Sequence, residues 1–492
     1  MTFKPDFPKF KKLTHKGNLI AVTKTVPADL ETPVSGFLKL AGSLVHAFLL
    51  ESAEQGEHIG RYSVIGLEPE RVLSQIKAHI DLTVDGRKRR LQTAQSLINL
   101  LEASLQGQKL ANPEALPEFC GGYVGYFSYE NVEHFEKIKL SHKQGPSVPD
   151  AIFFLTRHFL IFDHFRKTLT AVVIAKIDNP GRAQTVYEAS LRTIERDLAR
   201  LRRPLKLKRR ARELQNVRFV SNITRGLFEK KVRKIKEYIR AGDCIQVVFS
   251  QRFMMYSDRD DFQIYRALRS INPSPYMFYF RCGKVRLIGA SPELLVKNKG
   301  RLAELRPIAG TRPRGDTEKG DRVLRESLLG SHKEMAEHLM LVDLGRNDLG
   351  RVCEFNSVRV KNFARVENYS HVMHLVSDVV GKLKNGKNSF DLLKAAFPAG
   401  TVTGAPKIRA MQIIDELETE KRGPYAGCLG YFSFNRDMEV CITIRTLVVE
   451  GNKVYLQAGA GIVKDSNPAR EYQETLNKAK ALVQAIKDQG DF

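Results

Sequence analysis

The chain has 492 residues, of which 42% are hydrophobic and 27% charged, a composition typical of globular proteins with sizeable cores. Its longest apolar runs are strand-sized, well short of the roughly 20 residues of a membrane helix, and its N-terminal stretch lacks the apolar core of a secretion signal. Six scattered cysteines without a Cys-x-x-Cys pair exclude a disulfide framework or zinc site, so we expect a cytoplasmic protein.

The predicted elements begin with a hairpin over 151–175, turning around Asp163–Lys167, and a helix over 183–201. A second helix is capped by Thr224 and ends near Gly242, because apolar residues recur between them at spacings of three and four. Between these helices, residues 199–214 carry eight basic residues and one acid. We interpret the run as part of a linker. A nucleic-acid-binding arm is the alternative, which the absence of aromatic residues for base stacking disfavours.

The second half of the chain continues with strands and helices and few regular βαβ alternations. The expected strands cover 285–297, 426–434, 438–450 and 453–463, and helices cover 333–344 and a final segment from Pro468. Many hairpin-like neighbours predict an α+β fold with largely antiparallel sheets. One internal echo, Gly-x-x-Gly-Tyr-Phe-Ser at 122–128 and again at 427–433, suggests equivalent strands in the two halves.

Two pairs of glutamates stand three residues apart on predicted helices, Glu334 with Glu337 and Glu471 with Glu474. Residues at this spacing share one helix face. Taken alone, each pair is more often a solvated face than a site. Two pairs beside other unusual motifs favour a shared divalent cation, and oxygen-only ligands favour Mg²⁺ over zinc.

Other candidates suit a small anion. Gly310-Thr311 and the Gly459–Gly461 stretch let main-chain amides approach a ligand closely. Arg445 is expected within an apolar strand, where its charge needs either an internal salt bridge or a bound carboxylate. Semi-buried Glu293 could deliver a proton, and His374 could shuttle one, although a lone histidine is more often a packed core residue.

These segments together resemble the chorismate-utilising enzymes, most closely their anthranilate synthase component I branch. The resemblance covers about residues 20–486 and is densest in RPIAGTRPRG (306–315), EHLMLVDLGRNDLGRV (337–352), GTVTGAPKIRAMQIIDELE (400–418) and LQAGAGIVKDSNPAREYQETLNKAKAL (456–482). It implies a large β-sandwich with helices on its outer faces. It divides the chain into an N-terminal regulatory domain (1–198), the basic linker (199–222) and a chorismate-binding catalytic domain (223–486).

The resemblance also implies an activity and residue roles. It implies a lyase that makes anthranilate from chorismate and ammonia with Mg²⁺, in a heterotetramer with a glutamine amidotransferase subunit that supplies the ammonia. It places Mg²⁺ on Glu337 and Glu474, with Glu334 and Glu471 nearby. Catalytic roles fall to Glu293, His374 and Thr403, and chorismate contacts to Gly310, Thr311, Tyr425, Arg445, Gly459, Ala460, Gly461 and Lys478.

Two positions bear on the choice of reaction. Isochorismate and salicylate synthases carry a lysine base where this chain has Gln246, and many aminodeoxychorismate synthases carry a lysine where it has Ala309. Both residues favour ammonia addition giving anthranilate, with aminodeoxychorismate synthase as the alternative. The resemblance also implies feedback inhibition by L-tryptophan at a site formed by Ser52, Pro275, Tyr276 and Met277.

Overall fold

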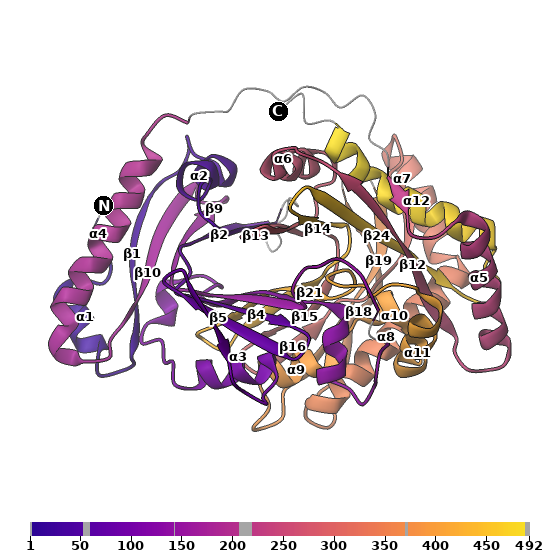
Figure 1. Ribbon diagram of the computed structural model, residues 1–492, viewed down its shortest axis with the longest axis horizontal. Helices are drawn as coiled ribbons and strands as arrows, with labels where there is room; N and C mark the ends of the chain where they lie inside the picture. The colour runs from indigo at the N-terminus through magenta and orange to yellow at the C-terminus, as the bar shows by residue number, and fades with distance from the viewer. Residues whose placement is uncertain (1, 53–59, 142, 206–218, 370–371, 488–492) are drawn as a thin grey trace.

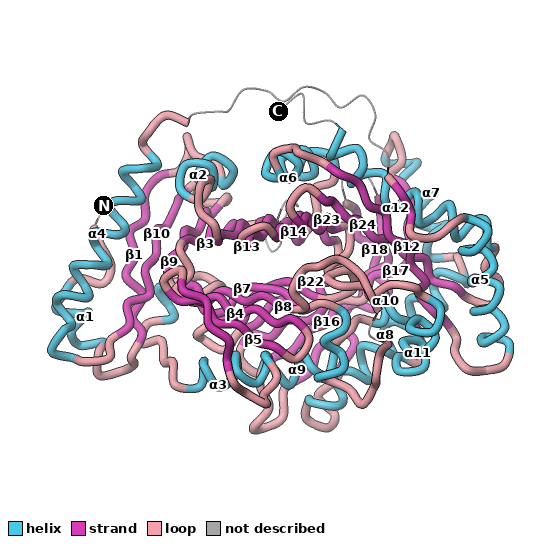
Figure 2. Tube along the Cα trace, viewed as in Figure 1, coloured by secondary structure: helices cyan, strands magenta, loops and turns pink. Residues whose placement is uncertain are grey.

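The computed structural model describes residues 2–52, 60–141, 143–205, 219–369 and 372–487. Within these residues, two 12-stranded sheets form an α+β sandwich, and helices lie at its periphery (Figure 1). Figure 2 shows the strands gathered in the interior and the helices around them. None of the described helices is both long and apolar enough to cross a membrane.

Neighbouring strands within each of the two sheets pair antiparallel, as the sequence predicts. The first sheet contains, in spatial order, β1 (Leu19–Pro27), β10 (Thr168–Lys176), β9 (His158–Asp163), β3 (Tyr62–Leu67), β2 (His46–Glu51), β13 (Tyr276–Cys282), β14 (Val285–Ser291), β23 (Thr446–Glu450), β24 (Lys453–Ile462), β12 (Gln246–Tyr256) and β11 (Val220–Ser221), with β20 (Gly404–Ala405) beside β12. The second contains β17 (Ile308–Pro313), β19 (Val372–Lys382), β16 (Leu302–Leu305), β15 (Leu294–Lys299), β22 (Met438–Ile442), β21 (Cys428–Ser433), β7 (Gly122–Phe127), β8 (Ala151–Thr156), β4 (Arg71–Ile76), β5 (His79–Val84) and β6 (Arg87–Leu91), with β18 (Arg359–Asn368) beside β19.

The helices and short 3₁₀ turns connect these strands. They are α1 (Phe7–Leu13), α2 (Pro33–Leu40), α3 (Leu97–Gln106), α4 (Ala183–Leu201), α5 (Arg225–Arg240), α6 (Asp261–Ile271), α7 (Glu318–Leu329), α8 (His332–Val352), α9 (Ser389–Ala396), α10 (Gly400–Thr403), α11 (Lys407–Leu417) and α12 (Pro468–Lys487), with 3₁₀ turns at Pro113–Ala115, Tyr129–His134 and Pro180–Arg182. The predicted helix over 183–201 coincides with α4. Thr224 caps α5 by accepting a hydrogen bond from the amide of Leu227 at 3.4 Å.

Aromatic side chains fill the space between the two sheets. Phe154 of β8 stacks on Phe280 of β13 with ring centroids 4.4 Å apart, and Tyr126 of β7 meets the same ring edge-on. These contacts join opposite sheets, and all three residues are no more than 1% exposed. Burial of such rings is the main stabilisation of the sandwich, at roughly 25 cal/mol per Å² of apolar surface.

The repeated Gly-x-x-Gly-Tyr-Phe-Ser motif marks two neighbouring strands at the middle of the second sheet. β7 and β21 pair directly, with Gly125 opposite Gly430. A Cβ atom on Gly125 would lie 1.9 Å from the carbonyl oxygen of Ile152, and one on Gly430 would lie 2.0 Å from that of Glu439. The glycines therefore permit a close backbone approach on both sides of the pair.

Both sheets contain strands from both of the predicted domains. Strand β2 pairs with β13 in the first sheet, as β7 pairs with β21 in the second. Strand β11 lies within the predicted linker and pairs with β12, while residues 206–218 of that linker lie outside the described residues. The two segments thus share one sandwich, and the proposed domain division stays a prediction.

Two predicted strands are wrong in a way that matters for the site. Residues 438–450 form two strands, β22 in the second sheet and β23 in the first, separated by a break at 443–445. Arg445 therefore lies outside a strand, and its φ of +51° turns the chain from one sheet to the other. The predicted strand over 285–297 is likewise two strands, β14 in the first sheet and β15 in the second, with Pro292 and Glu293 between them.

Candidate active site

The two sheet crossings lie side by side and bring Glu293 close to the segment that carries Arg445. The amide of Ile442 donates to the carbonyl of Glu293 at 3.0 Å, and the amide of Ala290 donates to the carbonyl of Arg445 at 3.1 Å. Residues from two strand breaks, about 150 positions apart in the sequence, are thus fixed next to each other by backbone hydrogen bonds.

Arg445 has an unusual environment for a cation. Its guanidinium forms no salt bridge or side-chain hydrogen bond with the residues that the structure describes. Burial lowers its pKa, and only Tyr425 and Glu474 act in the opposite direction. The internal salt bridge that the sequence left open is therefore absent among these residues. An enclosed guanidinium with free donors suits a bidentate anion such as a carboxylate.

Glu293 is an acid held in its protonated form. It is 9% exposed, and burial raises its pKa to about 8 against the opposing effects of Thr401 and Lys478. A carboxyl group that is neutral at pH 7 and ionised slightly above it can donate a proton to a leaving group. The expectation that Glu293 has a raised pKa is confirmed.

The predicted carboxylates on α8 and α12 lie near enough to influence one another. Burial and then the charge of Glu334 raise the pKa of Glu337, and Glu474 on the other helix adds to the effect. Burial and Glu474 also raise the pKa of Glu471, whose side chain is largely enclosed. Lys333 of α8 lowers the pKa of both Glu337 and Glu471, so the N-terminal part of α8 and that of α12 lie within electrostatic reach of each other.

This cluster fits Mg²⁺ in the sparse mode of binding that this ion prefers. Within the described residues, no three carboxylate, imidazole or thiolate groups gather closely enough to form a protein-only metal site. Mg²⁺ commonly binds through one or two carboxylates, water and substrate oxygens. Neighbouring carboxylates raise each other's pKa because their charges repel, and a bound divalent cation would relieve this repulsion. Glu474 is meanwhile paired with Lys478 at 2.7 Å and is partly open to solvent.

One wall of the site is formed by the Gly310 turn and His374. The Nδ1–H of His374 donates to the carbonyl of Gly310 at 2.9 Å and lies 3.1 Å from the hydroxyl of Thr311. This bond leaves Nε2 as the unprotonated nitrogen. Burial lowers the His374 pKa, and Arg445 lowers it further. A Cβ on Gly310, whose φ is +64°, would lie 3.2 Å from a carboxylate oxygen of Glu334.

A further part of the candidate site is the end of β24. Pairing of β23 with β24 stops at Leu447 and Leu456, because the chain turns away at Arg445. Beside Gly459–Gly461, the edge of β24 that faces away from β12 therefore has no partner strand among the described residues. Lys478 donates to the carbonyl of Gly459 at 3.0 Å. A Cβ on Gly459 would lie 2.8 Å from the phenol oxygen of Tyr425, so glycine leaves room for that hydroxyl.

Thr403 is placed less openly than the resemblance implies. It is fully buried, and its hydroxyl donates to the carbonyl of Ala399 at 2.8 Å, one turn back in the chain. Thr403 is thus the last residue of α10 and its hydroxyl proton is engaged within that turn, so its catalytic role stays a prediction.

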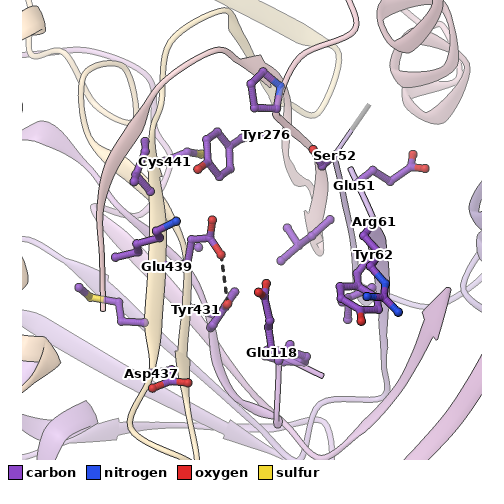
Figure 3. Close-up of a pocket in the computed structure, with 18 of the residues that line it drawn as sticks. Glu51, Ser52, Arg61, Tyr62, Glu118, Tyr276, Tyr431, Asp437, Glu439 and Cys441 are labelled. Carbon is purple, nitrogen blue, oxygen red and sulfur yellow. Dashed lines mark hydrogen bonds between the residues drawn. The ribbon is translucent and has the colours of Figure 1, made fainter. Parts of the chain in front are cut away.

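A cavity of about 630 Å³ lies elsewhere, between the two sheets (Figure 3). All four predicted effector residues line it: Ser52, Pro275, Tyr276 and Met277. None of Glu293, Glu337, Glu474 or Arg445 does. The volume is within the usual range for a small-molecule site.

Sequence reasoning missed most of the polar residues of this cavity, among them Glu439 and Tyr431. Glu439 and Tyr431 point toward each other in Figure 3, and the Tyr431 hydroxyl donates to the carboxylate at 3.2 Å. Burial raises the pKa of Glu439. The signal was an acid between Met438 and Val440, the same pattern of a charge among apolar residues that singled out Arg445.

Comparison with known proteins shows which family this chain resembles. The chorismate binding enzyme family matches residues 46–484. Anthranilate synthase component 1 of Acetivibrio thermocellus is 44% identical over all of both chains, and that of Aquifex aeolicus is 46% identical over 97% of this chain and 96% of its own. The crystal structure of anthranilate synthase component I from Streptococcus pneumoniae aligns with a TM-score of 0.75 at 34% identity, covering 93% of this chain and 98% of that one. The chain therefore belongs to the chorismate binding enzymes, in their anthranilate synthase component 1 group.

Proposed function

We propose that this protein is the large subunit of an anthranilate synthase, which converts chorismate and ammonia to anthranilate and pyruvate in the first committed step of tryptophan biosynthesis. The observation that carries the proposal is the enclosed and unpaired guanidinium of Arg445, close to protonated Glu293 and to the carboxylates of α8 and α12. Chorismate is a compact dianion with a hydroxyl leaving group. It needs a cation, a proton donor and main-chain donors close together, and these residues supply them.

The residues divide the binding of chorismate among them. Arg445 and Lys478 hold carboxylates, and Tyr425 and the free edge of β24 add neutral donors. The Gly310-Thr311 turn closes the opposite side. Glu337 and Glu474 would hold Mg²⁺, with Glu334 and Glu471 beside them. A bound Mg²⁺ supplies Lewis-acid stabilisation of negative charge on the substrate.

The reaction proceeds in two steps. Ammonia adds to the ring carbon next to the one that bears the carboxylate, the ring double bonds shift, and the carbon–oxygen bond to the hydroxyl breaks. Glu293 transfers its proton to that hydroxyl, which leaves as water. In the second step, the neutral Nε2 of His374 accepts the ring proton, the enolpyruvyl group leaves as pyruvate after protonation, and the ring becomes aromatic. Donors fixed in a water-poor site stabilise the charge that develops.

Partners and regulation complete the proposal. Gln246, a neutral amide, cannot activate water, which favours ammonia as the nucleophile, and a separate glutamine amidotransferase subunit in the cytoplasm would deliver it within a heterotetramer. L-Tryptophan would bind in the cavity at Ser52 and Pro275–Met277. It would favour a less active arrangement with a coupling free energy of about 1–3 kcal/mol.

Identification of the product tests the proposal. The purified chain, chorismate, Mg²⁺ and an ammonium salt should give a blue-fluorescent 2-aminobenzoate and pyruvate in equal amounts. A 4-amino product would instead assign the chain to aminodeoxychorismate synthase, and isochorismate would show that water is the nucleophile. Neither rival product is expected, because Ala309 and Gln246 lack the amines that the resemblance associates with those reactions.

A further inference from the structure

Arg422 is a buried cation that the proposed chemistry does not use. Its side chain is 1% exposed, and its guanidinium donates four hydrogen bonds. Nη1 donates to the carbonyl of Val402 at 2.7 Å, and Nη2 donates to the carbonyl of Val248 at 2.8 Å. Nε and Nη2 also donate to the two carboxylate oxygens of Glu418, at 2.8 and 2.7 Å. The guanidinium thus fixes the end of α11, the short helix α10 and strand β12 to one another.

Glu418 is itself anchored to β12. One of its oxygens accepts hydrogen bonds from the amide and the hydroxyl of Ser250, at 2.9 and 2.7 Å. A buried ion pair is costly unless its hydrogen bonds are complete, and this one is close to complete. Replacing such a pair by apolar residues is often neutral or stabilising. Fold stability alone therefore gives little reason for an arginine here.

The flat guanidinium also contacts two aromatic rings. Its central carbon lies 4.8 Å from the ring centre of Tyr129 and 5.6 Å from that of Tyr425, within the range of cation–π attraction. Tyr425 is the residue whose hydroxyl approaches Gly459 on the free edge of β24. Burial raises the Tyr425 pKa to about 12, so the phenol stays a proton donor, and Arg422 partly offsets the rise.

The segment around Arg422 is held from the N-terminal half of the chain as well. The amide of Tyr129 donates to the carbonyl of Gly423 at 2.9 Å, and the amide of Gly423 donates to the Glu130 carboxylate at 3.1 Å. Tyr129 therefore supports the guanidinium while Gly423 links the two halves. Strand β21, which contributes Tyr431 to the large cavity, begins three residues after Tyr425.

We propose that Arg422 is a positioning residue for chorismate binding, which fixes the ring and hydroxyl of Tyr425 against the edge of β24. Glu418 and Tyr129 hold Arg422 in place for this task. The inference rests on the proposed function, because it takes Tyr425 as a contact of chorismate. Only arginine offers a flat face for two rings together with donors at its rim, so lysine cannot replace it.

A double-mutant cycle tests the inference in the full-length protein. Tyr425→Phe removes the hydroxyl, and we expect the KM for chorismate to rise about tenfold, as for a lost hydrogen bond to a charged group. Arg422→Lys keeps the charge but loses the flat contact, and we expect a rise of at least about fivefold in KM with a smaller change in kcat. Because Arg422 acts through Tyr425, the double variant should match Tyr425→Phe within about twofold.

A matched control separates positioning from general destabilisation. Arg157→Lys alters another largely buried arginine, which pairs with Glu70 at 2.8 Å and lies over the ring of Phe434 rather than over either tyrosine. It should lower the melting temperature without raising the KM for chorismate. If Arg422→Lys is not folded by circular dichroism, Glu418→Gln takes its place in the same cycle, since it loosens Arg422 and keeps the hydrogen bonds of Ser250.

The outcomes distinguish the role of Arg422 from the proposed function of the protein. The positioning role would be overturned if the KM changes of Arg422→Lys and Tyr425→Phe multiplied in the double variant, or if Arg157→Lys raised the KM for chorismate as much as Arg422→Lys does. An unchanged KM in Tyr425→Phe, with anthranilate still the product, would overturn the chorismate contact on which the inference rests. Absence of anthranilate from the unaltered protein would instead reject the proposed function itself.

Discussion

Replacement of Glu293 by glutamine should make the protein inactive and, at the same time, more stable at neutral pH. Glutamine has nearly the same shape but neither donates an acidic proton nor ionises. The side chain is 9% exposed, and burial raises its pKa from an ordinary 4.5 to about 8. The folded protein therefore retains a proton that the unfolded chain releases above pH 4.5.

The sign of the effect follows from this difference in bound protons. The unfolded state binds fewer protons than the folded state between pH 4.5 and 8, so the stability of the unaltered protein falls as pH rises through this window. At about 1.36 kcal/mol for each pH unit, the full loss is about 5 kcal/mol, of which about 3 kcal/mol has accrued at pH 7. Glu293→Gln has no such loss.

Urea unfolding followed by circular dichroism at pH 5, 7 and 8 measures the difference between the two proteins. We expect Glu293→Gln to gain stability relative to the unaltered chain as pH rises, and to form no anthranilate at any pH. Glu188→Gln is the matched control, since its carboxylate lies on α4 with a side chain 47% exposed. A stability difference that stays constant from pH 5 to 8 would refute the assignment of Glu293 as a buried, protonated acid.

Two further predictions concern the metal and the effector cavity. Glu337→Gln should abolish synthesis of anthranilate while leaving the fold intact. It should also remove the rise in melting temperature that Mg²⁺ with chorismate gives the unaltered protein. Near-normal turnover of Glu337→Gln at limiting Mg²⁺ would contradict the metal assignment. Ser52→Phe should fill part of the cavity of about 630 Å³ and relieve inhibition by tryptophan with little change in the uninhibited rate. Inhibition curves that coincide with and without the substitution would place the effector elsewhere.

Local patterns in the sequence predicted most elements because the forces that form them are local. The helix over 183–201 and the cap at Thr224 follow from side-chain periodicity and from one hydroxyl. The hairpin around Asp163–Lys167 is also confirmed, since Asp163 pairs with Thr168 across the turn of β9 and β10. These features depend on residues that are close in the sequence, so the local residue pattern is sufficient to predict their positions.

The break at Arg445 could not be predicted in this way. Residues 438–450 alternate and contain β-branched side chains, as one long strand would. Tertiary structure splits the run, because its first part completes the second sheet and its last part completes the first. The positive φ that makes the turn belongs to an arginine, and the sequence has no glycine or asparagine at this position to indicate a turn. Most of the lining of the cavity was equally hidden, since it comes from strands of both sheets, and the resemblance supplied only Ser52 and Pro275–Met277.

The same break explains why the candidate site lies where it does. A left-handed backbone costs a non-glycine residue about 1–2 kcal/mol, and enclosing an unpaired guanidinium costs more. Glycine at 445 would remove both costs, so the fold alone does not account for arginine there. By turning away at Arg445, the chain leaves the edge of β24 free and directs a cation toward it. One strained residue thus creates both the main-chain donors and the charge that a small dianion requires, which is why strain here indicates function.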